Sequence, residues 1–164
     1  MKNKNAICLL VILVLPLFSC SGVPAYPCAA SLAEVEEVFA VPVPQPQLLP
    51  SGAVLDKVTL SDNTTASLFY RGDDGEDLEL RLQWYPENGI GHRIDLDAPT
   101  TIKLPFFVAS LETEESRKRI VWNLPYWHDY EGATVQGLMI ARLYVSEEVP
   151  DLDLASMAAS VRWE

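Results

Sequence analysis

Apolar and polar residues alternate with a period of two along the middle of the chain. The clearest stretch is 77–84, where polar or charged residues separate Leu78, Leu80, Leu82 and Trp84. Because successive side chains of a strand point to opposite faces of its sheet, this pattern predicts a strand with one buried, apolar face and one solvent-exposed, polar face.

Other segments share this period and are separated by turn residues. The link 72–75 has the Asp-Gly chemistry of a tight hairpin, so the segments on either side of it should pair. Every connection is too short for a crossover helix, which favours antiparallel pairing. The predicted strands are 54–60, 66–71, 77–84, 101–109, 118–124 and 134–145. Together they predict a curved, mainly antiparallel sheet of five to six strands.

A short helix is predicted before the sheet. Ser31 and Glu34 have the spacing of a capping box, in which each side chain accepts a hydrogen bond from the other residue's backbone. Leu32, Val35 and either Val38 or Phe39 share one face at helical spacing. The helix should end before the prolines that follow.

A second, amphipathic helix is predicted at the C-terminal end, with Asp151 or Asp153 as its N-cap. Its apolar face would carry Leu154, Met157, Ala158 and Val161. A sheet with one short helix before it and one helix after it predicts the α+β class.

Residues 41–52 form a proline-rich arm between the first helix and the first strand. Each proline fixes its own φ and removes a hydrogen-bond donor, so this segment should be extended and lie outside the central sheet. The arm belongs to a single predicted domain, residues 31–164.

The N-terminal segment is apolar over residues 6–18 and follows two lysines, Lys2 and Lys4. The run is too short to cross a bilayer as a stable helix, which indicates a signal peptide. Its end, Leu17-Phe18-Ser19-Cys20, resembles the lipobox of prokaryotic lipoproteins. The resemblance implies cleavage after residue 19 and a membrane anchor of diacylglycerol and acyl chains such as palmitate on Cys20. Residues 20–30 would then form a tether, whereas an ordinary secretory signal or an uncleaved anchor is the alternative.

The domain itself resembles an uncharacterised family. The likeness rests on the arm, which ends in Leu49-Pro50-Ser51-Gly52, on strand 54–60, and on Ala158-Ala159-Ser160-Val161 of the last helix. Members of that family are extracytoplasmic domains of prokaryotic lipoproteins, and some resemble anti-sigma-factor-like regulators. The resemblance implies a fold but no catalytic residue.

The chain is acidic, with a formal net charge of −11. Loss of Lys2 and Lys4 with the signal peptide would move the charge to −13. Such a field repels phosphate backbones, which argues against a nucleic-acid partner. Cys28 would be the only thiol left in the lipidated domain, so no internal disulfide is expected.

Neither histidine has the surroundings of a catalytic or metal site. His92 lies in a glycine-rich turn, and His128 has carboxylates beside it but no second histidine or cysteine at ligand spacing. The paired carboxylates at 73–74 and 76–77 flank a turn and lack the spacing of a calcium loop. We therefore predict no catalytic residue, no metal and no cofactor.

A group of aromatic residues near 122–130 is the sharpest candidate for recognition. Trp122 shares its alternation with Ile120 and Leu124 and is predicted to be core. Tyr126, Trp127 and Tyr130 remain as a candidate binding surface, because such rings can stack on a sugar or a peptide.

These observations lead to one main functional hypothesis and two alternatives. The first is a non-enzymatic binding or sensing module, lipid-anchored on the extracytoplasmic side, with a protein or peptide partner. Ser21, the residue after the cysteine, resembles the pattern of lipoproteins that are sent to the outer membrane. The outer membrane is the expected location if the source is a diderm bacterium. The second is an envelope chaperone or carrier that holds an apolar ligand on a concave sheet. The third is an enzyme of unknown type.

Overall fold

The computed structural model describes residues 27–73, 77–85, 93–114, 116–130 and 133–163. The elements in chain order are β1 (Cys28–Ala30), α1 (Leu32–Phe39), β2 (Gln45–Pro46), β3 (Val54–Ser61), β4 (Thr65–Arg71), β5 (Asp77–Tyr85), β6 (Thr101–Lys103), β7 (Val108–Glu114), β8 (Arg117–Tyr130), β9 (Ala133–Ser146), α2 (Asp151–Ala159) and β10 (Val161–Arg162).

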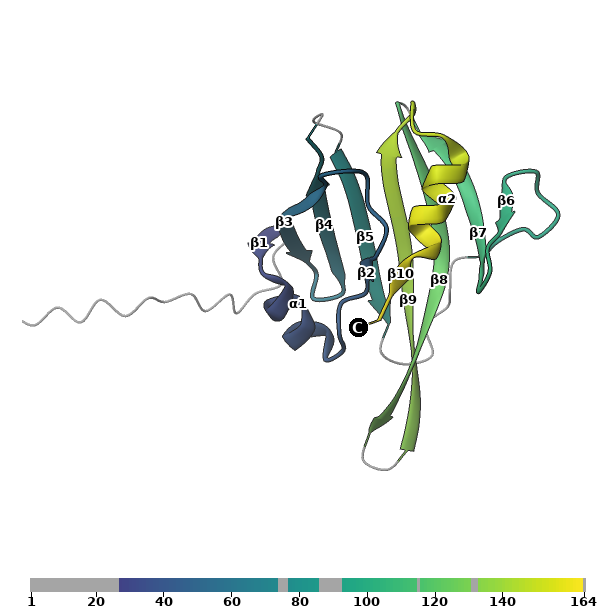
Figure 1. Ribbon diagram of the computed structural model, residues 1–164. Helices are drawn as coiled ribbons and strands as arrows, with labels where there is room; N and C mark the ends of the chain where they lie inside the picture. The colour runs from purple at the N-terminus through teal and green to yellow at the C-terminus, as the bar shows by residue number, and fades with distance from the viewer. Residues whose placement is uncertain (1–26, 74–76, 86–92, 115, 131–132, 164) are drawn as a thin grey trace, which may run out of the picture.

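The main sheet is antiparallel, and its two helices make the fold α+β, as predicted (Figure 1). Its strand order is β1-β3-β4-β5-β9-β8-β7-β6. The prediction of five to six strands is wrong, because the described sheet has eight, and it is not strongly curled. β1 is formed by residues 28–30, which were predicted to belong to the tether. The stretch 101–109 is divided at Pro105, where the N–H of Leu104 bonds the carbonyl of Phe107 and closes a turn.

One face of the sheet forms the hydrophobic core. The four apolar residues of β5 predicted to share a face are all buried. Trp122 is also fully buried, which confirms its assignment to the core. Both helices, the arm and the small sheet formed by β2 and β10 lie on this side (Figure 1). The apolar face is therefore covered by the chain's own residues.

The first helix is built as the sequence predicts. The Ser31 hydroxyl accepts from the N–H of Glu34, and the Glu34 carboxylate accepts from the Ser31 N–H at 2.6 Å. The carboxylate also accepts from the Ser31 hydroxyl at 2.9 Å, and its two hydrogen bonds from the Ser31 N–H and the Ser31 hydroxyl hold the pKa of Glu34 below its ordinary 4.5. Val35 and Phe39 are buried whereas Val38 is exposed, so Phe39 completes the apolar face.

The second helix begins earlier than either predicted start, by one residue if Asp151 were the N-cap and by three if Asp153 were. Its N-cap is Pro150 rather than Asp151 or Asp153, and no side chain caps it. Both aspartates lie in the first turn, where negative charge favours the helix dipole. Val161 is not helical, because the chain leaves the helix at Ser160 and pairs through β10 with β2 of the arm.

The longest strands, β8 and β9, form a hairpin that extends past the rest of the sheet (Figure 1). Residues 127–130 pair only with residues 133–136 in the described register. Where this ribbon leaves the sheet, Gly137 lies against Trp84, and a Cβ at Gly137 would overlap the six-membered ring. A residue without a side chain is therefore needed there.

Candidate functional site

Of the predicted aromatic surface, Tyr126 packs against the core. Its ring meets Trp84 edge-on at 6.2 Å between centroids and lies 4.5 Å from the Trp163 ring. Trp127 and Tyr130 have described backbones in the β8–β9 ribbon, but their side chains lie outside the described residues, as does that of His128. Tyr126 was predicted as part of a binding surface, although it continues the alternation of Ile120, Trp122 and Leu124 on β8, and nothing local indicated Trp163 as its partner.

Cys20 and His92 lie outside the described residues, so lipidation of Cys20 stays a prediction. Cys28 is exposed in β1, at the edge of the sheet. In the described part of the chain, no helix is long and apolar enough to cross a membrane. No group of three or more His, Cys, Asp or Glu side chains among these residues is arranged to hold a metal ion.

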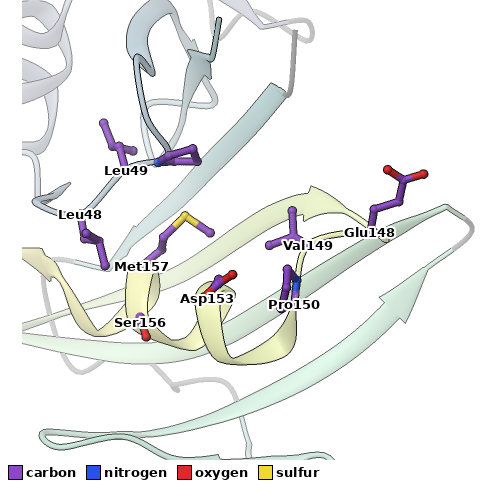
Figure 2. Close-up of a pocket in the computed structure, with 9 residues that line it drawn as sticks. Leu48, Leu49, Glu148, Val149, Pro150, Asp153, Ser156 and Met157 are labelled. Atoms are coloured by element: carbon purple, nitrogen blue, oxygen red, sulfur yellow. The ribbon is translucent and has the colours of Figure 1, made fainter. Parts of the chain in front are cut away.

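A groove of about 410 Å³ lies between the arm and α2 (Figure 2). We call it the arm–α2 groove; it is lined by Leu48, Leu49, Pro50, Glu148, Val149, Pro150, Asp153, Ser156 and Met157. Its volume is within the range of ligand-binding pockets, about 300–1,000 Å³. Leu48 is half exposed at the edge of the groove.

Hydrogen bonds fix both walls of the groove. On the arm side, the N–H of Leu48 donates to the Ser160 hydroxyl at 2.9 Å, and the N–H of Gln47 donates to the Ser160 carbonyl. On the opposite side, Lys118 of β8 donates to the carbonyl of Val149 at 3.0 Å and to Asp151 at 2.9 Å. The groove therefore exists before any ligand binds.

The rim of the groove is acidic. Lys118 neutralises Asp151, whereas Glu148 and Asp153 have no ion pair among the described residues. An apolar floor with two unpaired carboxylates fits a ligand that carries both apolar and cationic groups.

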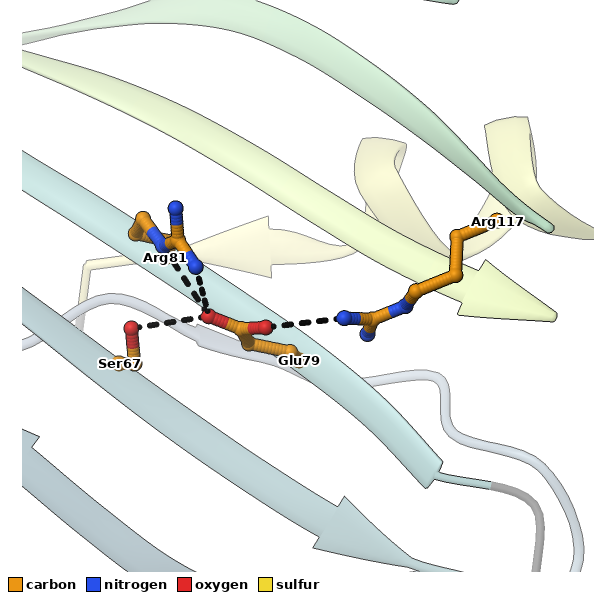
Figure 3. A network of polar contacts seen from close by, with 4 residues as sticks. All are labelled: Ser67, Glu79, Arg81 and Arg117. Atoms are coloured by element: carbon orange, nitrogen blue, oxygen red, sulfur yellow. Dashed lines mark hydrogen bonds and ion pairs between the residues drawn. The ribbon is translucent and has the colours of Figure 1, made fainter. Parts of the chain in front are cut away.

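The second face of the sheet carries a polar network centred on Glu79 of β5 (Figure 3). Glu79 is only 3% exposed, although the alternation of 77–84 predicted that its polar residues face the solvent. One carboxylate oxygen accepts from Ser67 at 3.0 Å and from Nε and Nη2 of Arg81 at 3.0 and 2.8 Å. The other accepts from Arg117 at 3.2 Å. The carboxylate is buried because two guanidinium groups cover it.

Tyr144 lies beside this network, and three arginines surround its ring. The guanidinium carbons of Arg81, Arg117 and Arg119 lie 5.0, 5.1 and 6.0 Å from the ring centroid. Glu112 holds Arg119 with an Nε–O distance of 2.8 Å, and this hydrogen bond is the main cause that raises the pKa of Arg119. The acidic chain thus concentrates cations on this face of its sheet.

Beside Glu79 is a depression of about 290 Å³, which we call the hydroxyl hollow. It is lined by Pro27, Thr59, Ser61, Thr65, Ser67, Phe69, Glu79 and Arg81. Register explains its composition, because Thr59, Ser67 and Arg81 are consecutive partners across β3, β4 and β5. The sequence shows which of these residues share a face of their own strand, but not that the three strands bring them together.

The chain matches no family model, no curated protein and no solved structure. The resemblances to the lipobox and to the uncharacterised domain family therefore stay predictions.

Proposed function

We propose that the protein is a lipid-anchored extracytoplasmic binding module that captures a segment of another protein in the arm–α2 groove. The observation that carries this proposal is the groove of about 410 Å³, whose lining combines apolar side chains with the carboxylates of Glu148 and Asp153. The ligand class that fits is an extended peptide segment with an apolar side chain next to a lysine or arginine.

The contacts of the groove support this ligand. Leu48, Leu49 and Val149 offer apolar surface to one inserted side chain, and the two rim carboxylates attract the neighbouring positive charge. Because Ser160 and Lys118 already hold the walls, binding loses little conformational entropy.

Anchoring through Cys20 would keep the groove close to a membrane surface. The first described residue is Pro27, directly before β1 and seven residues after Cys20. An extended chain of that length spans at most about 25 Å. The module would therefore act on partners at the same membrane.

The carrier alternative receives less support. It requires an open apolar sheet face, but in the described residues that face is covered by α1, the arm and α2. The arm–α2 groove is formed by the covering layer, not by a concave sheet.

The ligand class can be tested by selecting a random peptide library against the full chain and measuring affinities by fluorescence anisotropy. We expect the selected peptides to share an apolar residue beside a lysine or arginine. Leu48→Ser and Asp153→Asn should each lower the affinity for these peptides by about fivefold or more. Leu96→Ser and Asp97→Asn provide a matched control, because this exposed leucine and aspartate lie outside the groove. Selected peptides that bind the groove variants as well as they bind the wild type would refute the proposal.

The anchor has a separate test. Cys20→Ser should abolish incorporation of labelled fatty acid and release the protein from the membrane fraction. Membrane retention of the unprocessed variant would show that the apolar segment itself is the anchor, and the lipoprotein hypothesis would then be wrong.

A further inference from the structure

From the second face of the sheet we infer that the hydroxyl hollow is a binding site for a neutral sugar in its ring form. This inference is independent of the arm–α2 groove, because the two sites have no lining residue in common. A sugar ring has apolar C–H faces and a rim of hydroxyl groups. The hollow offers an aromatic ring for the C–H faces and hydroxyl groups for the rim.

Phe69 supplies the apolar wall. It occupies a position on β4 where alternation with buried Leu68 and Tyr70 places a side chain on the second, mostly polar face. Its ring is half-buried, lies in the lining of the hollow, and has the Lys57 ammonium 5.7 Å from its centroid. A half-covered aromatic ring beside hydroxyl groups is suited to packing against the C–H face of a sugar.

The hydroxyl groups of Thr59, Ser61, Thr65 and Ser67 supply the polar wall. The hydroxyl groups of Thr59, Ser61 and Thr65 can both donate and accept a hydrogen bond, as can each hydroxyl of a sugar, whereas Ser67 already donates to Glu79 and can only accept from the ligand. Hydroxyl-to-hydroxyl pairing requires no charge on the ligand, which favours a neutral sugar.

Arg81 is held in place for recognition. Its Nε and Nη2 are bound to Glu79, and its guanidinium lies 5.0 Å from the centroid of Tyr144. These contacts fix the plane of the guanidinium and leave Nη1 for a ligand. Glu79 in turn balances part of the positive charge, so the hollow does not present an isolated cation.

The size of the hollow limits the ligand. A volume of about 290 Å³ is just below the range of ligand pockets, about 300–1,000 Å³, which limits the ligand to one sugar unit of a glycan. Binding of so small a unit through a few hydrogen bonds and one ring should be weak, with a Kd on the order of 1 mM for the free monosaccharide.

The test is an array of immobilised neutral and anionic glycans probed with the labelled full chain, followed by competition with the free monosaccharide of each bound glycan. We expect binding to a subset of neutral glycans. Phe69→Leu removes the ring but keeps apolar bulk and should lower affinity about 2- to 10-fold. Thr65→Val removes one hydroxyl group and should lower affinity by a similar factor.

The controls separate this site from the groove. Asp153→Asn and Leu96→Ser should bind the same glycans as the wild type. Circular dichroism reports whether each variant is folded, and if Phe69→Leu does not fold, Thr65→Val decides. Absence of neutral-glycan binding, binding to anionic glycans only, or unchanged binding by the hollow variants would each overturn the inference.

Discussion

Replacing Glu79 by glutamine tests whether the carboxylate organises the second face of the sheet. Glutamine keeps the shape of the side chain and removes its charge. Its oxygen can still accept from Arg81, but its NH₂ group would then face Arg117, which can only donate. The substitution thus weakens the two hydrogen bonds from Arg81 and the one from Ser67, and breaks the one from Arg117, without leaving a cavity.

The size of the effect follows from the contacts of Glu79. A hydrogen bond to a charged group contributes about 1.5–3 kcal/mol, against about 0.5–1.5 kcal/mol for a neutral one. Three guanidinium N–H groups bind the carboxylate, so loss of the charge costs up to about 3 kcal/mol before relaxation. The side chains of Arg81 and Arg117 are 42% and 41% exposed and can recover hydration. We therefore expect a loss of about 1–3 kcal/mol in the free energy of unfolding.

Urea unfolding followed by tryptophan fluorescence measures this loss, as a lower midpoint with an unchanged m value. Glu112→Gln is the matched control, because its ion pair with Arg119 is less buried on the carboxylate side, 31% exposed against 4% for Glu79. We expect that variant to lose less than about 1 kcal/mol. If Glu79→Gln is no less stable than Glu112→Gln, the buried carboxylate does not organise this face and the reasoning is wrong.

Three further predictions concern other parts of the fold. Gly137→Ala should lower the free energy of unfolding by about 1–3 kcal/mol in urea, because its Cβ would displace the buried Trp84 ring; unchanged stability would contradict the tight contact. Glu34→Gln should lower stability near neutral pH, and its difference from the wild type should shrink as pH falls below 4.5, because the Ser31 bonds stabilise the ionised carboxylate; a carboxyl titration of Glu34 by NMR with an ordinary pKa would refute this. Tyr70→Phe should unfold at an equal or higher urea concentration, because the buried phenol, whose pKa burial raises, has no hydrogen-bond partner among the described residues; a loss above about 1 kcal/mol would reveal one.

Features that depend on neighbouring residues were predictable from the sequence. The capping box needs only residues three positions apart, and the burial of the β5 leucines needs only a period of two. The pairing of β4 with β5 likewise follows from a short link. In each case the deciding interaction is local, so the local pattern is sufficient.

Features that depend on distant pairing were missed. β1 is a strand because residues 28–30 find an open edge at β3, which nothing in their own sequence indicates. Val161 continues the apolar spacing of α2, yet it leaves the helix because Pro46 offers a strand partner more than a hundred residues earlier. Helical spacing at a helix end therefore did not distinguish a last turn from a short strand that buries the same residue.

The arm–α2 groove and the polar network around Glu79 also depend on pairing between distant residues. The aromatic surface was the more visible candidate in the sequence because its residues are neighbours. The groove needs Ser160 to hold Leu48, residues 112 positions apart, and the network needs Arg117 to reach Glu79 across β9. A run such as Tyr126-Trp127 is conspicuous because its members are neighbours, but adjacent residues of a strand point to opposite faces. Residues that share a binding surface of a sheet come from alternate positions of adjacent strands. Register aligns Thr59, Ser67 and Arg81 on one face of this sheet, and no run of neighbouring residues in the sequence shows that alignment.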